Sequence, residues 1–201
     1  MIRDLRPYAA MKDSCVPWLG QVPEHWEFRR AKYFFRECDE RSTTGQEELL
    51  SVSHITGVTP RSAKNINMFM AESNVGYKIC RPDDVVINTM WAWMAALGVA
   101  RQPGIVSPSY AVYRPLSGNG LQANYIDRLL RTPAYASVYL CASTGVNASR
   151  LRLYPDRFLT VPILRPPAAE QAAIVRFLAH ADLRIRRYIS AKQKLIRLLE
   201  E

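Results

Sequence analysis

The chain ends in a segment without glycine or proline that directly follows Pro166 and Pro167 and is rich in helix-forming residues. Apolar side chains recur in it at alternating steps of four and three residues, the heptad spacing of a helix that packs on another helix. These positions are Ile174, Leu178, Ala181, Ile185, Tyr188, Leu195 and Leu199, with Lys192 at one step. A lone helix cannot bury such a stripe. The sequence therefore predicts a long helix over residues 167–201 that needs a partner helix.

Residues 1–166 have the mixed texture of a separate α/β (α+β) domain. β-Branched runs between turn formers indicate strands, including a buried one over residues 85–88 and another over residues 107–115. We expect a mixed, strongly twisted sheet with flanking helices, followed by a coiled-coil-type helix.

Helical spacing also occurs within the first domain. It predicts helices over residues 121–143, where Pro133 starts the second, and a short helix over residues 29–36. The opening residues are rich in proline and irregular, so we expect Trp18 and Trp26 to fix an extended segment to the domain.

Composition allows a packed core and favours an anionic partner. The chain is 48% hydrophobic and carries a net charge of +9, with a pI near 9.6. Arginine greatly outnumbers lysine among the 27 basic residues. Arginine binds phosphate and guanine bidentately, although a GC-rich genome gives the same bias, so composition alone leaves the partner open.

The cysteines and histidines do not indicate a metal site. The histidines His25, His54 and His180 are isolated, so we expect structural or surface roles for them. The cysteines are too far apart for a CxxC-type site, and we expect reduced thiols at Cys15, Cys38, Cys80 and Cys141.

No targeting or membrane segment is visible. The most apolar run, residues 85–100, is too short to span a bilayer and contains Asn88 and Thr89, so it is expected to be core. We expect a cytoplasmic protein without a membrane partner.

Signatures of catalysis are also missing. The chain has neither the (D/N)PP(Y/F)-type loop nor the glycine-rich turn of adenine methyltransferases, and no P-loop. None of its six lysines follows an acidic residue by two positions, as the common nuclease motif requires. Asp83 and Asp84 follow Pro82 and are expected to form a turn. We predict a non-catalytic protein with no cofactor or metal of its own.

Three stretches, in this order, resemble specificity subunits of type I restriction-modification enzymes. KDSCVPWLGQVPEHWEFRR at residues 12–30 resembles the entry to a target-recognition domain, and GIVSPSYAVYRP at residues 104–115 its mid-domain strand. RFLTVPILRPPAAEQAAIVRFL at residues 157–178 is similar to the exit into the spacer helix. The resemblance covers nearly the whole chain and implies a DNA target-recognition domain over 1–166 with a spacer and dimerisation helix over 167–201.

The resemblance implies recognition of one half of a bipartite site in double-stranded DNA, without catalysis by the chain itself. Methyltransferase subunits, which bind S-adenosylmethionine, modify an adenine in each half, and a motor-nuclease subunit joins for restriction. Complete members have two recognition domains whose helices pair antiparallel, whereas this chain has one of each. We expect a truncated fragment, since the chain ends within a charged helix, or else a natural half-subunit that pairs with a second copy.

Loops between the predicted elements are the natural carriers of base-contacting side chains. Arginine suits guanine, and asparagine or glutamine suits adenine. Three loops supply the candidates, which are Arg61, Lys64 and Asn65, then Arg101 and Gln102, and then Thr144, Gly145, Asn147 and Arg150. The first loop fits a solvated hairpin equally well. Trp91 and Trp93 are expected in the core rather than on bases.

Two alternatives remain at this point. The chain can be a coiled-coil adaptor whose domain merely caps the helix, or an enzyme with an unfamiliar site. The basic residues of the helix are expected to be solvated or to contact a partner, and an approach to DNA across the spacer is the less favoured alternative. These are Arg184, Arg186, Arg187, Lys192, Lys194 and Arg197.

Overall fold

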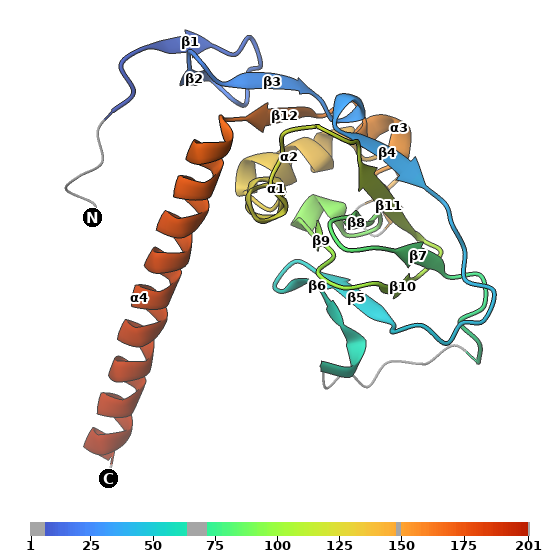
Figure 1. The fold of residues 1–201 in the computed structure, drawn as a ribbon. Helices are drawn as coiled ribbons and strands as arrows, with labels where there is room; N and C mark the ends of the chain where they lie inside the picture. The colour runs from blue at the N-terminus through green and yellow to red at the C-terminus, as the bar shows by residue number, and fades with distance from the viewer. Residues whose placement is uncertain (1–6, 64–71, 148–149, 201) are drawn as a thin grey trace.

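The computed structural model describes residues 7–63, 72–147 and 150–200 (Figure 1). A head of short strands and helices, residues 7–165, precedes one long helix, α4 (Ala168–Glu200), which extends away from it (Figure 1). The expected α+β class and long C-terminal helix are confirmed. Among the described residues, no helix combines the length and the apolar run needed to cross a membrane.

The centre of the head is a four-stranded antiparallel sheet. Its strand order is β4 (Phe35–Cys38), β11 (Tyr110–Pro115), β8 (Val85–Asn88) and β9 (Leu97–Val99). All four residues of β8 are buried, as its run of β-branched side chains predicts. The strands predicted over residues 85–88 and 107–115 are confirmed as β8 and β11.

Two further strand pairs pack beside this sheet. β5 (Leu50–Ser53) forms a hairpin with β6 (Gly57–Pro60), and β7 (Lys78–Cys80) pairs with β10 (Gly104–Val106). Every pairing between strands in the described part of the chain is antiparallel, and the parallel contact is the single bridge between Leu49 and Ile105. The expected mixed sheet is therefore realised as several small antiparallel sheets.

Three helices cover the other face of the central sheet. They are α1 (Ala123–Leu130), α2 (Pro133–Ala142) and the single turn α3 (Pro155–Phe158), and Pro133 opens α2 as expected. Because side chains alternate along a strand, one set of sheet residues packs with these helices and the other with the strand pairs β5–β6 and β7–β10. The Tyr113 and Phe158 rings, 4.4 Å apart between centroids, lie in the helix-side core.

The two ends of the head come together in a separate strand pair. β3 (Glu27–Arg30) pairs with β12 (Pro162–Arg165), and β1 (Met11–Asp13) with β2 (Gln21–Pro23) forms a hairpin before it (Figure 1). Trp18 lies edge-on against Tyr135, with 5.1 Å between ring centroids. The opening segment is therefore fixed to the head, as expected for Trp18.

The short helix predicted over residues 29–36 is wrong. Arg29 and Arg30 belong to β3, and only the single 3-10 turn η2 (Ala31–Tyr33) follows before β4. The Ala31 N–H donates to the Val161 carbonyl at 2.8 Å. Pairing with a strand that is distant in sequence thus overrides the local helical spacing.

The start of α4 is held by a buried amide. Gln171 is fully buried, and its Oε1 accepts the Gln122 N–H at 2.8 Å. Its Nε2 donates to the Gly120 and Pro166 carbonyls, both at 2.8 Å. One side chain therefore satisfies three backbone groups and joins the helix to the loop before α1.

The neighbouring Glu170 joins the helix to the opening segment. It accepts hydrogen bonds from Tyr8 at 3.0 Å, His25 at 2.6 Å and Trp26 at 2.9 Å. Farther along, Asp182 pairs with Arg128 of α1 at 2.7 Å. The first half of α4 is thus attached to the head at three points.

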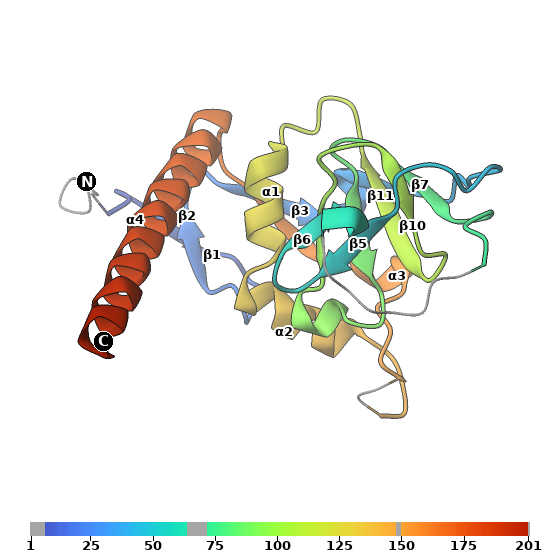
Figure 2. The same ribbon diagram turned by 90° about the horizontal axis from the view of Figure 1, so that it is seen from below.

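The second half of α4 has no such support from the described residues. Every residue from 183 to 200 is exposed, and the helix runs free of the head there (Figures 1 and 2). Ile185, Tyr188, Leu195 and Leu199 of the heptad stripe are exposed, whereas Ile174, Leu178 and Ala181 are half-buried. The apolar stripe lacks a partner along half of the helix, which leaves the predicted helix pairing open.

Replacing Gln171 with Ala removes three hydrogen bonds and leaves buried backbone groups unpaired. We expect a loss of roughly 2 to 4 kcal/mol in the free energy of unfolding. Urea denaturation measures it, and Gln193→Ala on the exposed half of α4 serves as the control, with a change within about 0.5 kcal/mol. Equal stability of the two variants contradicts the role given to Gln171.

Glu170 links stability to pH. Burial opposes its ionisation, but the hydrogen bonds from Trp26, His25 and Tyr8 outweigh burial, so the pKa of Glu170 is lowered. A lowered pKa in the folded state stabilises the protein above the ordinary value of 4.5, and this contribution is lost as the pH falls below it. We expect Glu170→Gln to be less stable than wild type at neutral pH, with a gap that closes below pH 4.5 in thermal denaturation. A gap that is constant with pH contradicts this.

Candidate nucleic-acid interface

Two chain segments form a surface hollow on the head. Its volume is about 420 Å³, and one wall is Met90, just after β8. The remaining lining residues come from the stretch after α2 and are Thr144, Gly145, Arg150, Leu151, Arg152 and Tyr154. The lining therefore combines cationic, hydroxyl and aromatic groups on connecting segments.

The stretch after α2 is a narrow hairpin. Thr144 and Arg152 exchange backbone hydrogen bonds at 3.0 and 2.9 Å. A Cβ on Gly145 would lie 2.5 Å from the Arg150 carbonyl oxygen, so only glycine fits that close approach. The hairpin protrudes from the side of the head near α2 and α3 and does not lie against α4 (Figure 2).

A buried leucine anchors the hairpin to the sheet. Leu153 is fully buried in the helix-side core, and its N–H donates to the Thr89 carbonyl at 3.0 Å. Tyr154, the next residue, is half exposed. The base of the hollow is therefore continuous with the end of β8, while its rim is accessible.

A tryptophan pair lies beside Met90. Trp91 is 49% exposed and stacks on Trp93 with 6.0 Å between ring centroids and 19° between planes. Trp93 is half-buried, and its Nε1 donates to the Met90 carbonyl at 3.2 Å. The expectation that both rings are core is wrong for Trp91, because the small Ala92 occupies the core in the 3-10 turn η4 (Ala92–Met94).

The structure brings together part of the predicted site. Thr144, Gly145 and Arg150 line the hollow, and Asn147 is exposed on the same hairpin. Sequence reasoning missed Arg152, which also lines the hollow.

The other predicted residues lie elsewhere or outside the described chain. Arg101 and Gln102 are exposed between β9 and β10, and Arg101 lies 3.9 Å from the Asp127 carboxylate. Arg61 begins the 3-10 turn η3 (Arg61–Ala63) and is half-buried. Lys64 and Asn65 lie outside the described residues.

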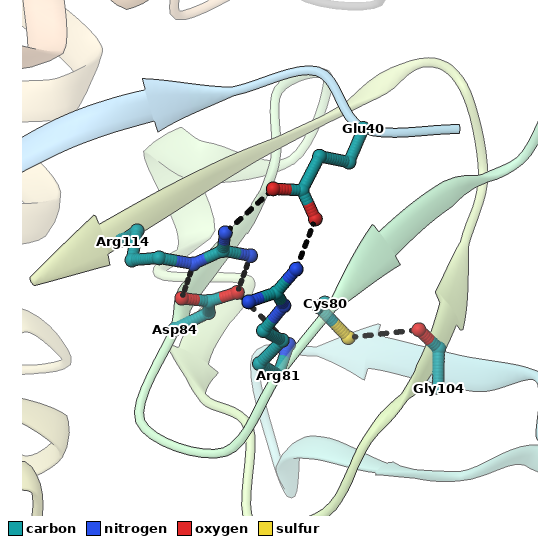
Figure 3. Close-up of polar contacts among 6 residues, drawn as sticks. All are labelled: Glu40, Cys80, Arg81, Asp84, Gly104 and Arg114. Atoms are coloured by element: carbon teal, nitrogen blue, oxygen red, sulfur yellow. Dashed lines mark hydrogen bonds and ion pairs between the residues drawn. The ribbon is translucent and has the colours of Figure 1, made fainter. Parts of the chain in front are cut away.

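The acidic pair after Pro82 is structural. Asp83 is exposed in the turn at a positive φ of 72°, whereas Asp84 is only 1% exposed. Arg114 donates to both Asp84 oxygens, at 3.1 and 3.0 Å, and to Glu40 at 2.8 Å (Figure 3). Arg81 donates to the other Glu40 oxygen at 2.9 Å (Figure 3). The Asp84 and Glu40 carboxylates are therefore both paired with arginine side chains of the fold.

The thiol next to this network is inert. Burial, followed by the nearby Asp84 charge, raises the pKa of Cys80 to about 12. Its Sγ lies 3.5 Å from the Gly104 carbonyl oxygen (Figure 3). In the described part of the chain, no three acidic, histidine or cysteine side chains are grouped to hold a metal ion.

Replacing Asp84 with Asn leaves Arg114 without its buried counter-charge. We expect a loss of about 3 kcal/mol in the free energy of unfolding, measured by chemical denaturation. Asp83→Asn is the matched control, and it should be nearly neutral because asparagine tolerates a positive φ. Similar stabilities for both variants contradict the structural role of Asp84.

The fold is shared with solved structures of type I restriction-modification proteins. A chain from a structure on complex assembly and conformational transition of a type I system aligns with a TM-score of 0.56 and 20% identity, over 86% of this chain and 42% of that one. The HsdS subunit from Thermoanaerobacter tengcongensis gives 0.51 and 20% over 85% and 40%. The type I S subunit from M. genitalium gives 0.50 and 11% over 83% and 41%.

The chain spans about two-fifths of the length of these structures. No protein-family model matches the sequence, and no curated protein matches it. The expected resemblance to type I specificity subunits is confirmed at the level of the fold.

Proposed function

We propose that this chain is a DNA target-recognition module of a type I specificity subunit. It recognises one half of a bipartite site and performs no catalysis itself. The observation that carries the proposal is the hollow, which two arginines, a threonine and a tyrosine line on a head with the fold of specificity subunits. The exposed Trp91 directly follows Met90 of that lining.

The chemistry of the hollow suits base recognition. Arg150 and Arg152 have the guanidinium geometry that binds a guanine edge or a phosphate bidentately. Thr144 and Asn147 supply groups for phosphate or adenine. Trp91 offers an apolar ring, already stacked on Trp93, that can pack on sugars or enter a base step. Arg61, Arg101 and Gln102, with Lys64 and Asn65, are proposed as further contacts outside the hollow.

In this proposal the long helix α4 mediates assembly with other subunits. Residues 1–166 act as the recognition domain, and residues 167–201 as the spacer helix, whose apolar stripe packs on a second such helix in the same protein or in a homodimer. Methyltransferase subunits carrying S-adenosylmethionine modify the DNA in the cytoplasm, and a motor-nuclease subunit joins for restriction.

A coiled-coil adaptor without DNA recognition is the second candidate. The exposed half of the apolar stripe favours it, since Ile185, Tyr188 and Leu199 offer a surface for another helix. The adaptor hypothesis predicts that the hairpin arginines have no effect on any activity of the assembled complex.

The recognition role is tested with the methyltransferase complex on a duplex library of randomised sequence. We expect wild type to enrich one half-site. Arg150→Ala together with Arg152→Ala should weaken binding and relax selection by about 1 to 3 kcal/mol for each base that the arginines bind. Lys12→Ala in β1 is the matched control for removal of charge. Equal enrichment of all sequences by wild type refutes the recognition role, and unchanged selection by the double variant favours the adaptor.

A further inference from the structure

Helix α4 carries a second surface besides the apolar stripe. Seven cations of the described helix are exposed, and five of them lie away from the stripe. We call these five the cationic face, and they are Arg176, Arg186, Arg187, Lys194 and Arg197. In the part of the chain that the structure describes, the ion pairs of α4 are made by Glu170 and Asp182, not by these five residues.

Helical spacing places these cations together. Arg187 and Lys194 are 7 residues apart, which is about two full turns. Arg186 and Arg197 are 11 residues apart, which is about three full turns. At 3.6 residues per turn, the centre of the cationic face lies about 170° from the centre of the heptad stripe. The same helix can therefore pack on a partner helix with one side while the other side stays accessible.

A second copy of the helix cannot neutralise these charges. No acidic residue occurs between Leu183 and Leu199, and the flanking acids are Asp182, Glu200 and Glu201. Asp182 is already paired with Arg128. A copy packed on the apolar stripe lies on the opposite side of the helix from the cationic face. Lys192 differs from the five because its ammonium lies 5.5 Å from the Tyr188 ring centroid, on the side of the stripe. The cationic face therefore calls for a partner that presents a row of negative charges.

The dimensions of the face suit a nucleic-acid backbone. Arg176 and Arg197 are 21 residues apart in a continuous helix, which is about 32 Å. That length corresponds to roughly nine phosphates of one DNA strand at 3.4 Å each. The hairpin with the hollow projects from the head apart from α4, so DNA beside the helix is a different stretch from the DNA at the hollow (Figure 2).

We propose that the cationic face binds the phosphates of the DNA between the two recognised half-sites. This inference rests on the proposed function. The interaction adds affinity that depends on salt and not on sequence, because lysine and arginine on phosphates release counterions without touching base edges.

The test uses a double variant that carries both Arg187→Gln and Lys194→Gln. It is compared with wild type in the assembled methyltransferase complex. The probes are a long duplex that contains the half-site selected by wild type and a duplex trimmed to that half-site. On the long duplex, the slope of log affinity against log salt should become shallower by about 1.8, since each phosphate that a cation neutralises contributes about 0.9. On the trimmed duplex, the variant and wild type should have the same slope. The control is Arg184→Gln with Lys192→Gln, which removes two charges nearer the stripe.

Each outcome separates the inference from the function on which it rests. An unchanged slope on the long duplex, or an equal change in the control, overturns the role of the cationic face. Weaker assembly with the methyltransferase at an unchanged slope also overturns it and points to an acidic protein surface. Wild type without any sequence preference refutes the recognition role itself, whereas an altered base preference in the double variant refutes binding through phosphates alone.

Discussion

The geometry of the whole molecule depends on how the first turn of α4 is attached to the head. Gln171 is buried and hydrogen-bonded to three backbone groups, and Glu170 gathers three donors from the opening segment. Hydrogen bonds of this kind have direction as well as strength, so they fix an orientation in a way that apolar packing does not. The pairing of β3 with β12 brings the opening segment to that point. The helix is therefore aimed by contacts from both ends of the head.

Within the head, packed strands form the scaffold and connecting segments carry the exposed contact groups. The central sheet is packed on both faces, and the Asp84–Arg114 pair fastens the turn before β8 to the neighbouring strand. The segment after β8 carries Met90, which lines the hollow, and the exposed Trp91. Leu153 joins the hairpin to this segment through the Thr89 carbonyl. Rigid elements thus end in exposed connecting segments, which is how a stable scaffold presents variable contact groups.

Sequence reasoning succeeded where the tertiary structure agrees with the local pattern of residue types and spacing. The uninterrupted helix after Pro167, the second helix starting at Pro133 and the buried strand of β8 all follow from residue type and spacing alone. It failed over residues 29–36, where pairing with a distant strand decides the structure. No spacing rule anticipates that pairing.

The candidate site was predictable in part for a related reason. The hairpin residues were predicted as a loop with base-contacting side chains, but the segment that completes the hollow, with Met90, lies more than fifty residues earlier in the chain. The exposure of Trp91 depends on Ala92 filling the core beside it, and a hydrophobic run does not reveal which of its members is left outside.

The central claim is that the hairpin beside Trp91 touches bases while α4 stands away from the head. Photo-crosslinking tests it most directly, with a photoreactive amino acid in place of Val146, which is 96% exposed on the hairpin. In the methyltransferase complex on DNA, we predict crosslinks to nucleotides at one fixed position within the sequences that the complex selects. Crosslinks scattered along the duplex, or formed only to protein, contradict the claim.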